Sequence, residues 1–499
     1  MDRKTEVSKA EKSAAVIARI VARKYGKNLR AELGIEVYAY DKAGNPHPKP
    51  PAAIAEQLEG IFDFACPWAE DLPLSLLIYD HGVYVPAKKV LSRLLRVILP
   101  PSVSKSQYLS EIVSYLKDAT SYDIDAFDSE EGWLNTKTCW VNIYTKETRQ
   151  HDPKHLSIRQ LPIEYDPSAT CPKIDALFSQ WIDNPVILYE NIAHCLVTND
   201  YPIQTVVVLI GSGQNGKSSY LRLVVGFLGK ENVSSIELQS FGVNRFATHK
   251  VVGMLANICA DMDRKRFTNT AEFKKLTGDD PVQAEIKHGA LYTFFNTAKL
   301  MVSVNQLPPS PDDTDAFHRR IYRVPFKHKF VGAERRKMRD ILKDAKPEYS
   351  GLLNKCLQVL PALLDRQVFT GDTEDTDQKR DSYVRSAEPI FGFWEDHIEY
   401  RKDHDGSVKD DLFVKYSAFA KQHDIPPIKL ETFFVALKSE TLKRGFPYET
   451  HRVGPEDNRG PRLLKGIVYV EKKIDSDAEK PDAPSKITMD EVRSKGAPT

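Results

Sequence analysis

The chain contains a continuous apolar run at Thr205–Ile210, with five aliphatic residues in succession after the threonine. A strand with one face in water alternates apolar and polar residues, whereas a parallel strand covered on both faces is apolar throughout. Similar runs end at Ala260 and Val304, and helical patterns lie between the runs. This alternation over 205–326 predicts an α/β layer structure around a parallel sheet.

The pattern upstream of this segment predicts a smaller unit with both helices and strands. Two apolar stretches around Asp80-His81-Gly82 predict a hairpin. The other expected elements are helices at 89–98, 105–116 and 177–198 and short strands at 133–144 and 156–165.

The pattern downstream predicts a helical stretch at 332–364, a charged linker at 371–380 and a second compact unit. That unit has helices at 409–423 and 429–444, followed by a hairpin with the cations Arg452, Arg459, Arg462 and Lys465. Two helices and a basic wing are typical of a winged helix-turn-helix. Its recognition helix would present Lys429, Lys438, Lys443 and Arg444. DNA is the expected partner, although many winged helices bind proteins.

Composition adds limits to this picture. The 499 residues are 41% hydrophobic and 28% charged, and 70 Lys and Arg against 69 Asp and Glu give a net charge of +1. Any contact with nucleic acid must therefore come from local patches. Six scattered cysteines without a CxxC pair argue against a disulfide scaffold or a zinc finger. The charged N-terminus lacks the apolar core of a signal peptide, and no apolar run has the length of a membrane span. We expect a cytoplasmic, multidomain protein without a membrane partner.

A phosphate-binding motif follows the 205–210 run directly. The residues are Gly211, Ser212, Gly213, Gln214, Asn215, Gly216, Lys217, Ser218 and Ser219, which match GxxxxGK[ST]. Glycines let backbone N–H groups surround phosphate oxygens, and the N-terminus of the following helix adds partial positive charge. Lys217 would contact the β- and γ-phosphates, and the Ser218 hydroxyl would bind Mg²⁺. The motif predicts ATP and Mg²⁺ as cofactors, and the strand before it disfavours a chance glycine turn.

Polar residues at the ends of two later apolar runs are candidates for the rest of this site. Asp261 directly ends one run and could hold the metal and polarise water, with Asp263 as the second candidate. Asn305 ends the other run and could position the attacking water. A strand-end cap is the alternative for Asn305.

Two further groups of cations lie near these strands. Lys287 and His288 stand near the tip of a predicted hairpin, where they could follow a phosphate backbone or form a solvated turn. Arg319 and Arg320 precede the last predicted strand. One of them could reach the γ-phosphate of a neighbouring subunit, and an ordinary salt bridge is the alternative.

The order of these motifs resembles that of the superfamily 3 helicases of the AAA+ class, in particular the phage and plasmid primase–helicase and poxvirus primase-helicase-like family. The matching stretches are GSGQNGKSS, GMLANICADMD, FKKLTGDDPVQAEIKH, KLMVSVNQLPPSPDD and AFHRRIYRVPF. They follow the order of the A, B, B′ and C motifs and the arginine finger of that family. The resemblance covers residues 60–470 and is strongest over 205–330. Many relatives have Glu where this chain has Asp261, so the division of roles between Asp261 and Asp263 stays open.

The resemblance implies an ATP-dependent replicative DNA helicase of a plasmid, virus or mobile element. Such a protein would act as a homo-hexameric ring that moves 3′→5′ on single-stranded or forked DNA. Lys217, the Mg²⁺ on Ser218 and Asp261 would prepare the nucleotide, Asn305 would sense it, and Arg319 or Arg320 of the neighbour would complete the site. Lys287 and His288 would move along the DNA.

The implied domains are an N-terminal helical and β domain at 1–185, an α/β P-loop AAA+ core with a helical lid at 186–370, a winged helix at 386–472 and a disordered tail at 473–499. The DxD upstream of the core, Asp123-Ile-Asp125, lies in an acidic loop. We therefore expect no primase domain in this chain and consider a separate primase a candidate partner. Two alternatives remain, an origin-melting initiator that does not unwind processively and an ATPase that acts on protein or RNA.

Overall fold

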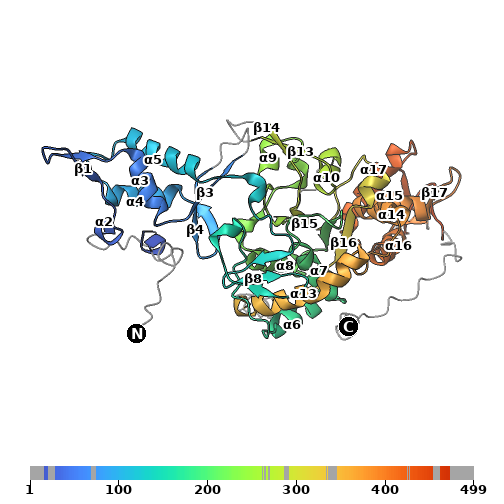
Figure 1. Cartoon of the computed structure of the whole chain (residues 1–499). Coiled ribbons are helices and arrows are strands. Elements are labelled where there is room, and N and C mark those ends of the chain that lie inside the picture. The colour runs from blue at the N-terminus through green and yellow to red at the C-terminus, as the bar shows by residue number, and fades with distance from the viewer. Residues whose placement is uncertain are drawn as a thin grey trace.

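The computed structural model describes most of the chain. The described residues are 16–20, 29–68, 75–260, 262, 266–267, 270–285, 291–332, 334, 336, 345–423, 425, 428–452 and 461–471. The predictions for Asp261, Asp263, Lys287, His288 and the tail fall outside these residues. Figure 1 shows a multidomain protein in which an N-terminal unit, a central α/β unit and a C-terminal unit follow one another.

A five-stranded parallel sheet forms the centre of the molecule, as the apolar runs predict. Its order is β11-β12-β15-β10-β16. The strands are β10 (Val206–Ile210), β11 (Val233–Ser234), β12 (Ala256–Cys259), β15 (Lys299–Val304) and β16 (Ile321–Pro325). Every residue of β10 and β15 is buried, because helices and loops cover both faces of the sheet.

Two hydrophobic clusters, one on each face, hold this sheet. Val207 and Leu209 belong to a cluster with helices α6, α7, α8 and α13, whereas Val206, Val208 and Ile210 belong to one with α10 and α11. The helices are α6 (Pro172–Trp181), α7 (Val186–His194), α8 (Lys217–Leu228), α9 (Arg245–His249), α10 (Thr270–Leu276), α11 (Asp315–His318) and α13 (Tyr349–Arg366). Alternate residues of one strand thus serve opposite cores.

The strand order creates a crevice at the carboxyl ends of β10 and β15. The chain leaves β10 through α8 and crosses to β11 at the far edge, whereas it leaves β15 through α11 and reaches β16 at the opposite edge. Neighbouring strands whose connections run in opposite directions open a crevice at their carboxyl ends, where α/β proteins bind ligands. The glycine loop (Gly211–Ser218) and Asn305 both follow strands at this crevice.

One long helix predicted over 177–198 is instead two helices, α6 and α7. Pro185 directly precedes α7 and has no N–H, and its ring would clash with the carbonyl one turn earlier. The break places Trp181, the last residue of α6, beneath the glycine loop. The prediction of one continuous helix was wrong because it gave helical periodicity more weight than this proline.

The N-terminal unit has its own core. Its sheet has the order β5-β4-β3-β6, and β1 and β2 form a separate two-stranded pair. The elements are α2 (Leu29–Glu32), β1 (Tyr38–Tyr40), β2 (Pro46–Pro48), α3 (Pro51–Glu59), β3 (Phe64–Trp68), β4 (Leu77–Asp80), β5 (Val83–Pro86), α4 (Lys88–Ile98), α5 (Ser106–Ala119) and β6 (Ser121–Asp123). The hairpin β4-β5 and both helices that follow confirm the predictions for this region.

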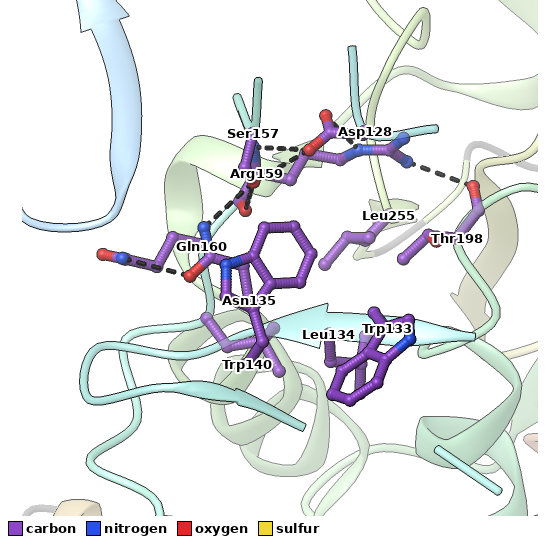
Figure 2. A pocket seen from close by; sticks show the side chains of 11 residues that line it. Asp128, Trp133, Leu134, Asn135, Trp140, Ser157, Arg159, Gln160, Thr198 and Leu255 are labelled. Carbon is purple, nitrogen blue, oxygen red and sulfur yellow. Dashed lines mark hydrogen bonds and ion pairs between the residues drawn. The ribbon is translucent and has the colours of Figure 1, made fainter. Parts of the chain in front are cut away.

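A second small sheet joins the N-terminal unit to the centre. Its strands are β7 (Trp133–Asn135), β8 (Trp140–Asn142) and β9 (Thr148–Arg149). Figure 2 shows the small pocket beside it, where the Arg159 side chain lies between Asp128 and Thr198. Arg159 Nε donates to Asp128 Oδ2 at 2.9 Å, and Nη1 donates to Thr198 O at 3.1 Å. The prediction of a strand at 156–165 is wrong, since this segment forms only an isolated β-bridge between Leu161 and Thr136.

The segment expected as a linker at 371–380 is folded, so that prediction was wrong. Helix α14 (Thr376–Ala387) begins there with a capping box formed by Asp375 and Gln378. Tyr383 donates to Pro308 O at 2.6 Å and packs with the hydrophobic cluster of α10 and α11. Lys379 pairs with Asp372 at 2.8 Å. The charges of this segment are therefore used in contacts, which the composition of a linker does not reveal.

The C-terminal unit contains the expected two helices and a following antiparallel pair. Its elements are α15 (Pro389–His397), β17 (Ile398–Tyr400), β18 (Ser407–Val408), α16 (Lys409–Gln422), α17 (Leu430–Lys443), β19 (Thr450–Arg452), β20 (Arg462–Leu464) and β21 (Ile467–Tyr469). Arg444, which was expected on the recognition helix, pairs with Glu395 at 2.7 Å and stacks on Trp394. Lys443 lies 3.5 Å from Glu440, and Lys429 and Lys438 are exposed.

Candidate nucleotide-binding site

The glycine loop adopts a backbone that its glycines permit. Gly213, Gln214 and Gly216 have φ values of +90°, +55° and +98°. A Cβ atom on Gly216 would lie 2.5 Å from Trp181 Cδ1. Gly216 therefore needs to be glycine for two reasons, its left-handed φ and the indole directly beneath it. Helix α8 begins at the next residue, so its free N–H groups face the loop.

The loop is held by the segment that follows β16. Asn215 Nδ2 donates to Phe326 O at 2.9 Å, and Phe330 N donates to Gln214 O at 2.8 Å. A Cβ on Gly211 would lie 2.0 Å from Asn215 Nδ2 and 2.5 Å from Phe326 O. Sequence reasoning placed Asn215 in the motif but missed this clamp. No local signal connects residues 111 positions apart.

The Lys217 amine lies inside the crevice, between the glycine loop and Asn305. Its side chain is only 3% exposed. Nζ donates to Gly211 O at 2.5 Å, Asn215 Oδ1 at 3.2 Å and Asn305 Oδ1 at 3.3 Å. The structure thus brings together Lys217 and Asn305, which the sequence separates by 88 positions. An amine in this position can form a strong, charge-assisted hydrogen bond with an anionic phosphate.

The residues that could hold a metal are only partly within the described part of the chain. Ser218 is exposed on the first turn of α8, and Ser219 is buried. Met262 lies beside β15, because its N donates to Ser303 O at 3.1 Å. Asp261 and Asp263 flank Met262 in the sequence and lie outside the described residues. Among the described residues, no group of three or more His, Cys, Asp or Glu side chains could hold a metal. The Ser218 hydroxyl is a suitable ligand for the Mg²⁺ that accompanies a bound nucleotide.

The two arginines before β16 have different surroundings. Arg320 is 6% exposed, and its Nη1 donates to Ala316 O at 2.7 Å and its Nη2 to Gln204 Oε1 at 3.4 Å. A Cβ on Gly278 would lie 3.2 Å from the same Nη2 atom. Burial lowers the pKa of the Arg320 guanidinium, and the Arg319 charge beside it adds to this. Arg320 therefore links α11 to Gln204, which lies just before β10.

Arg319 is exposed at the end of α11. β10 and β16 are parallel, with Val206 opposite Ile321 and Ile210 opposite Pro325. The arginines thus precede the amino end of the sheet, whereas the glycine loop follows the carboxyl end. At about 3.3 Å per residue, five residues separate them by roughly 16 Å, farther than one side chain reaches. Arg319 cannot contact a nucleotide in its own chain.

The hairpin of Lys287 and His288 is present, although its tip at 286–290 lies outside the described residues. β13 (Val282–Glu285) pairs antiparallel with β14 (Leu291–Phe294), as predicted. The hairpin leans on α9, where His249 Nδ1 and Tyr292 Oη are 2.5 Å apart. Leu291 and Phe295 are 55% and 66% exposed.

Two models of known protein families match parts of this chain. Residues 18–185 match a family model described as "D5 N terminal like", and residues 209–320 match a family of unknown function, DUF5906. These two families fit a phage-type primase–helicase-like protein, in agreement with the resemblance of the motifs. No curated protein matches the chain.

Solved structures of the NrS-1 C-terminal region are similar to this chain at low identity. An apo form aligns at 9% identity and a TM-score of 0.40, over 84% of this chain and 100% of that one. A second apo structure, of residues 305–718, aligns at 10% identity, the same TM-score and the same coverage. In the described part of the chain, no helix is both long and apolar enough for a membrane span.

Proposed function

We propose that this protein is an ATP-dependent DNA helicase of the superfamily 3 type, with an AAA+ core, that acts in the replication of a virus, plasmid or mobile element. The observation that carries the proposal is the position of the Lys217 amine. It lies between the glycine loop and Asn305, at the crevice where strand connections diverge. A chain that merely had a glycine-rich turn would have no reason to bury a lysine there.

The site residues have defined roles in this proposal. ATP would place its phosphates against the N–H groups of the loop and of α8, with Lys217 on the β- and γ-phosphates. Ser218, together with an acid from the 261–263 stretch, would hold Mg²⁺, which neutralises developing charge on the phosphates. Asn305 would orient the attacking water. Its Oδ1, which here accepts a hydrogen bond from Lys217 Nζ, would then accept one from the water.

The position of Arg319 supports a ring of subunits. It is exposed and lies at the opposite end of the sheet from the glycine loop of its own chain, so only a neighbouring subunit could use it. An arginine supplied in trans stabilises the charge of the transition state in many NTPases. We therefore propose Arg319, and not the buried Arg320, as the finger in a homo-oligomer that we expect to be hexameric.

DNA would be moved by the β13–β14 hairpin. Its second strand leads directly to β15 and Asn305, so a change at the nucleotide can reach the hairpin through one connection. Lys287 and His288 at the tip would provide sequence-independent contacts with phosphates. The C-terminal unit, if it is a winged helix, would add a second DNA contact through Lys429 and Lys438.

The test measures ATP hydrolysis with and without single-stranded DNA and the unwinding of a forked duplex. Lys217→Ala should lower hydrolysis by a factor of about 10³ or more, since contacts with the transferred phosphoryl group have effects of this size. Lys230→Ala is the matched control, because the Lys230 side chain is 83% exposed just beyond the end of α8 and pairs with the exposed Glu231.

Three results would contradict parts of the proposal. Hydrolysis by Lys217→Ala at the rate of Lys230→Ala would exclude the site. Hydrolysis stimulated by RNA or by an unfolded protein, and not by DNA, would identify another kind of motor. Hydrolysis stimulated by DNA without strand displacement would instead support the initiator that melts an origin and loads another helicase.

A further inference from the structure

The outer face of α4 carries four positive charges, and the helix itself contains no acidic residue. The helix reads KKVLSRLLRVI, and no Asp or Glu occurs between Asp80 and Glu111. The four cations are Lys88, Lys89, Arg93 and Arg96. Arg93 is partly exposed and the other three are exposed. None of them forms a hydrogen bond or an ion pair with a residue that the structure describes.

The helix separates charge from apolar surface completely. At 3.6 residues per turn, the four cations span about 140° of its circumference. The opposite side is buried in the core of the N-terminal unit and consists of Val90, Leu91, Leu94, Leu95 and Ile98. The cationic face extends over about 12 Å along the helix, at 1.5 Å per residue. It is therefore a rigid row of charges, fixed by the packing behind it.

Other described helices treat their cations differently. On α14, Lys379, Arg380 and Arg385 all pair with acids. On α17, Lys443 lies beside Glu440, and Glu431 accompanies Lys438 on the exposed side. Among the helices that the structure describes, α4 alone combines four cations with no acidic residue. Four like charges held close together repel each other, so this face is suited to an anionic partner.

We propose that this face of α4 binds the phosphate backbone of single-stranded DNA outside the ATPase core. The inference rests on the proposed function and extends it, because it assigns a DNA contact to the N-terminal unit, apart from the hairpin and the C-terminal unit. The backbone of a nucleic acid is a row of negative charges that needs no apolar contact. An acidic protein would need apolar anchors at the centre of its interface, and α4 offers only Val97, at 37% exposure. A membrane would need the apolar side of the helix, which is already buried.

The test uses the full-length protein and a labelled oligothymidylate. In the variant Lys88→Gln, Lys89→Gln, Arg93→Gln, Arg96→Gln, glutamine keeps the helix propensity and removes the charge. Affinity at low salt should fall roughly tenfold to a hundredfold. The slope of log affinity against log salt should become shallower by about 2 to 3, since each lost phosphate contact contributes about 0.7.

Two further variants make the result specific. The first exchanges the cations, Lys88→Arg, Lys89→Arg, Arg93→Lys and Arg96→Lys, and should keep the wild-type affinity and slope. The second removes four exposed lysines elsewhere, at Lys42, Lys137, Lys154 and Lys173, and should change affinity less than about threefold. Circular dichroism and the thermal midpoint should be the same for all variants, because no substituted side chain is buried.

Three outcomes would overturn the inference. They are an unchanged salt slope in the glutamine variant, an equal loss in the second control, and competition by polyglutamate as effective as that by DNA. Basal ATP hydrolysis without DNA is measured on the same samples. If the wild type hydrolyses no ATP, the proposed function fails, whereas the binding comparison still tests α4.

Discussion

Asn215 occupies a position that the motif leaves unspecified, yet it contacts both the phosphate-binding lysine and the segment after β16 that holds the loop. Its amide donates to Phe326 O, and its carbonyl oxygen accepts from Lys217. The motif fixes residue types only where phosphate chemistry requires them. The remaining positions are determined by the neighbours that the fold supplies. For this reason the sequence predicted the loop and its lysine but not the clamp.

Asn215→Ala should weaken nucleotide binding and stability together. Its loss leaves the buried Phe326 carbonyl without this donor, which costs about 1–3 kcal/mol, and loosens the loop, so that the nucleotide Kd should rise about tenfold. Urea unfolding and titration with a fluorescent ATP analogue measure the two effects. Asn45→Ala, which removes an exposed bond to Asp41, is the control. An unchanged Kd would show that the loop keeps its shape without the clamp.

The two adjacent arginines should separate in a stability measurement. Arg320→Ala leaves a cavity and unpaired partners at Ala316 and Gln204, so the free energy of unfolding should fall by about 2–4 kcal/mol. Arg319→Ala removes an exposed side chain and should change it by less than about 0.5 kcal/mol. Denaturant unfolding of both variants is the measurement. Equal losses would mean that Arg319 is also a structural residue.

At the scale of elements, periodicity predicted the strands well and the helix boundaries less well. The runs of β10, β12 and β15 are apolar because both faces of the sheet are covered, a cause that is visible in the sequence itself. The division of 177–198 into α6 and α7 depends on Pro185 and on the packing of Trp181 under Gly216. The second of these causes joins separate elements, and no window of sequence contains it.

Buried histidines, above all His194 at the end of α7, should make the fold sensitive to acid. His194 is 1% exposed and packs between the rings of Tyr201 and Phe369. Burial, and then the charge of Lys299, lower the pKa of His194 well below its usual value. Burial also lowers the pKa values of His151, His249 and His318. These histidines are neutral in the folded chain at pH values where the unfolded chain is protonated.

Stability should therefore fall as pH falls below about 6.5, the unfolded value, by up to about 1.4 kcal/mol per pH unit for each such histidine. Above that pH their contribution is fully present. His194→Phe keeps the ring between Tyr201 and Phe369, so it should reduce this slope without a large loss at pH 8. Urea unfolding from pH 5 to 8 measures it, with the exposed His47→Gln as control. A slope equal to that of the control would contradict the assignment.

At the scale of the whole molecule, Arg319 and the glycine loop lie at opposite ends of the central sheet. These positions suit a head-to-tail arrangement of subunits. One subunit would present its loop where the next presents its arginine. Such heterologous contacts generate closed rings when the rotation between subunits closes. The sequence predicted both partners of this contact, but only the register of β10 and β16 shows that they lie at opposite ends of one sheet.

Mixing two inactive variants should therefore restore activity. In a mixture of Lys217→Ala and Arg319→Ala, some interfaces combine an intact lysine with an intact arginine. Hydrolysis should reach a maximum near equal proportions, up to about a quarter of the wild-type rate if subunits mix randomly and interfaces act independently. The control mixes the Lys217→Ala variant with a double variant that carries both Lys217→Ala and Arg319→Ala. No interface in that mixture has an intact lysine. No rescue at any proportion would argue against a role in trans.

The folded connection at 371–387 has a consequence for how such proteins can be divided and recombined. Because Tyr383 and Ala387 belong to the core cluster of α10 and α11, the natural joint between the central and C-terminal units lies after α14, near Glu388. A crossover that exchanges C-terminal units between related genes at 371 would separate Tyr383 from its own core. One at 388 would keep every contact of α14 with that core, so inherited exchanges should be found there.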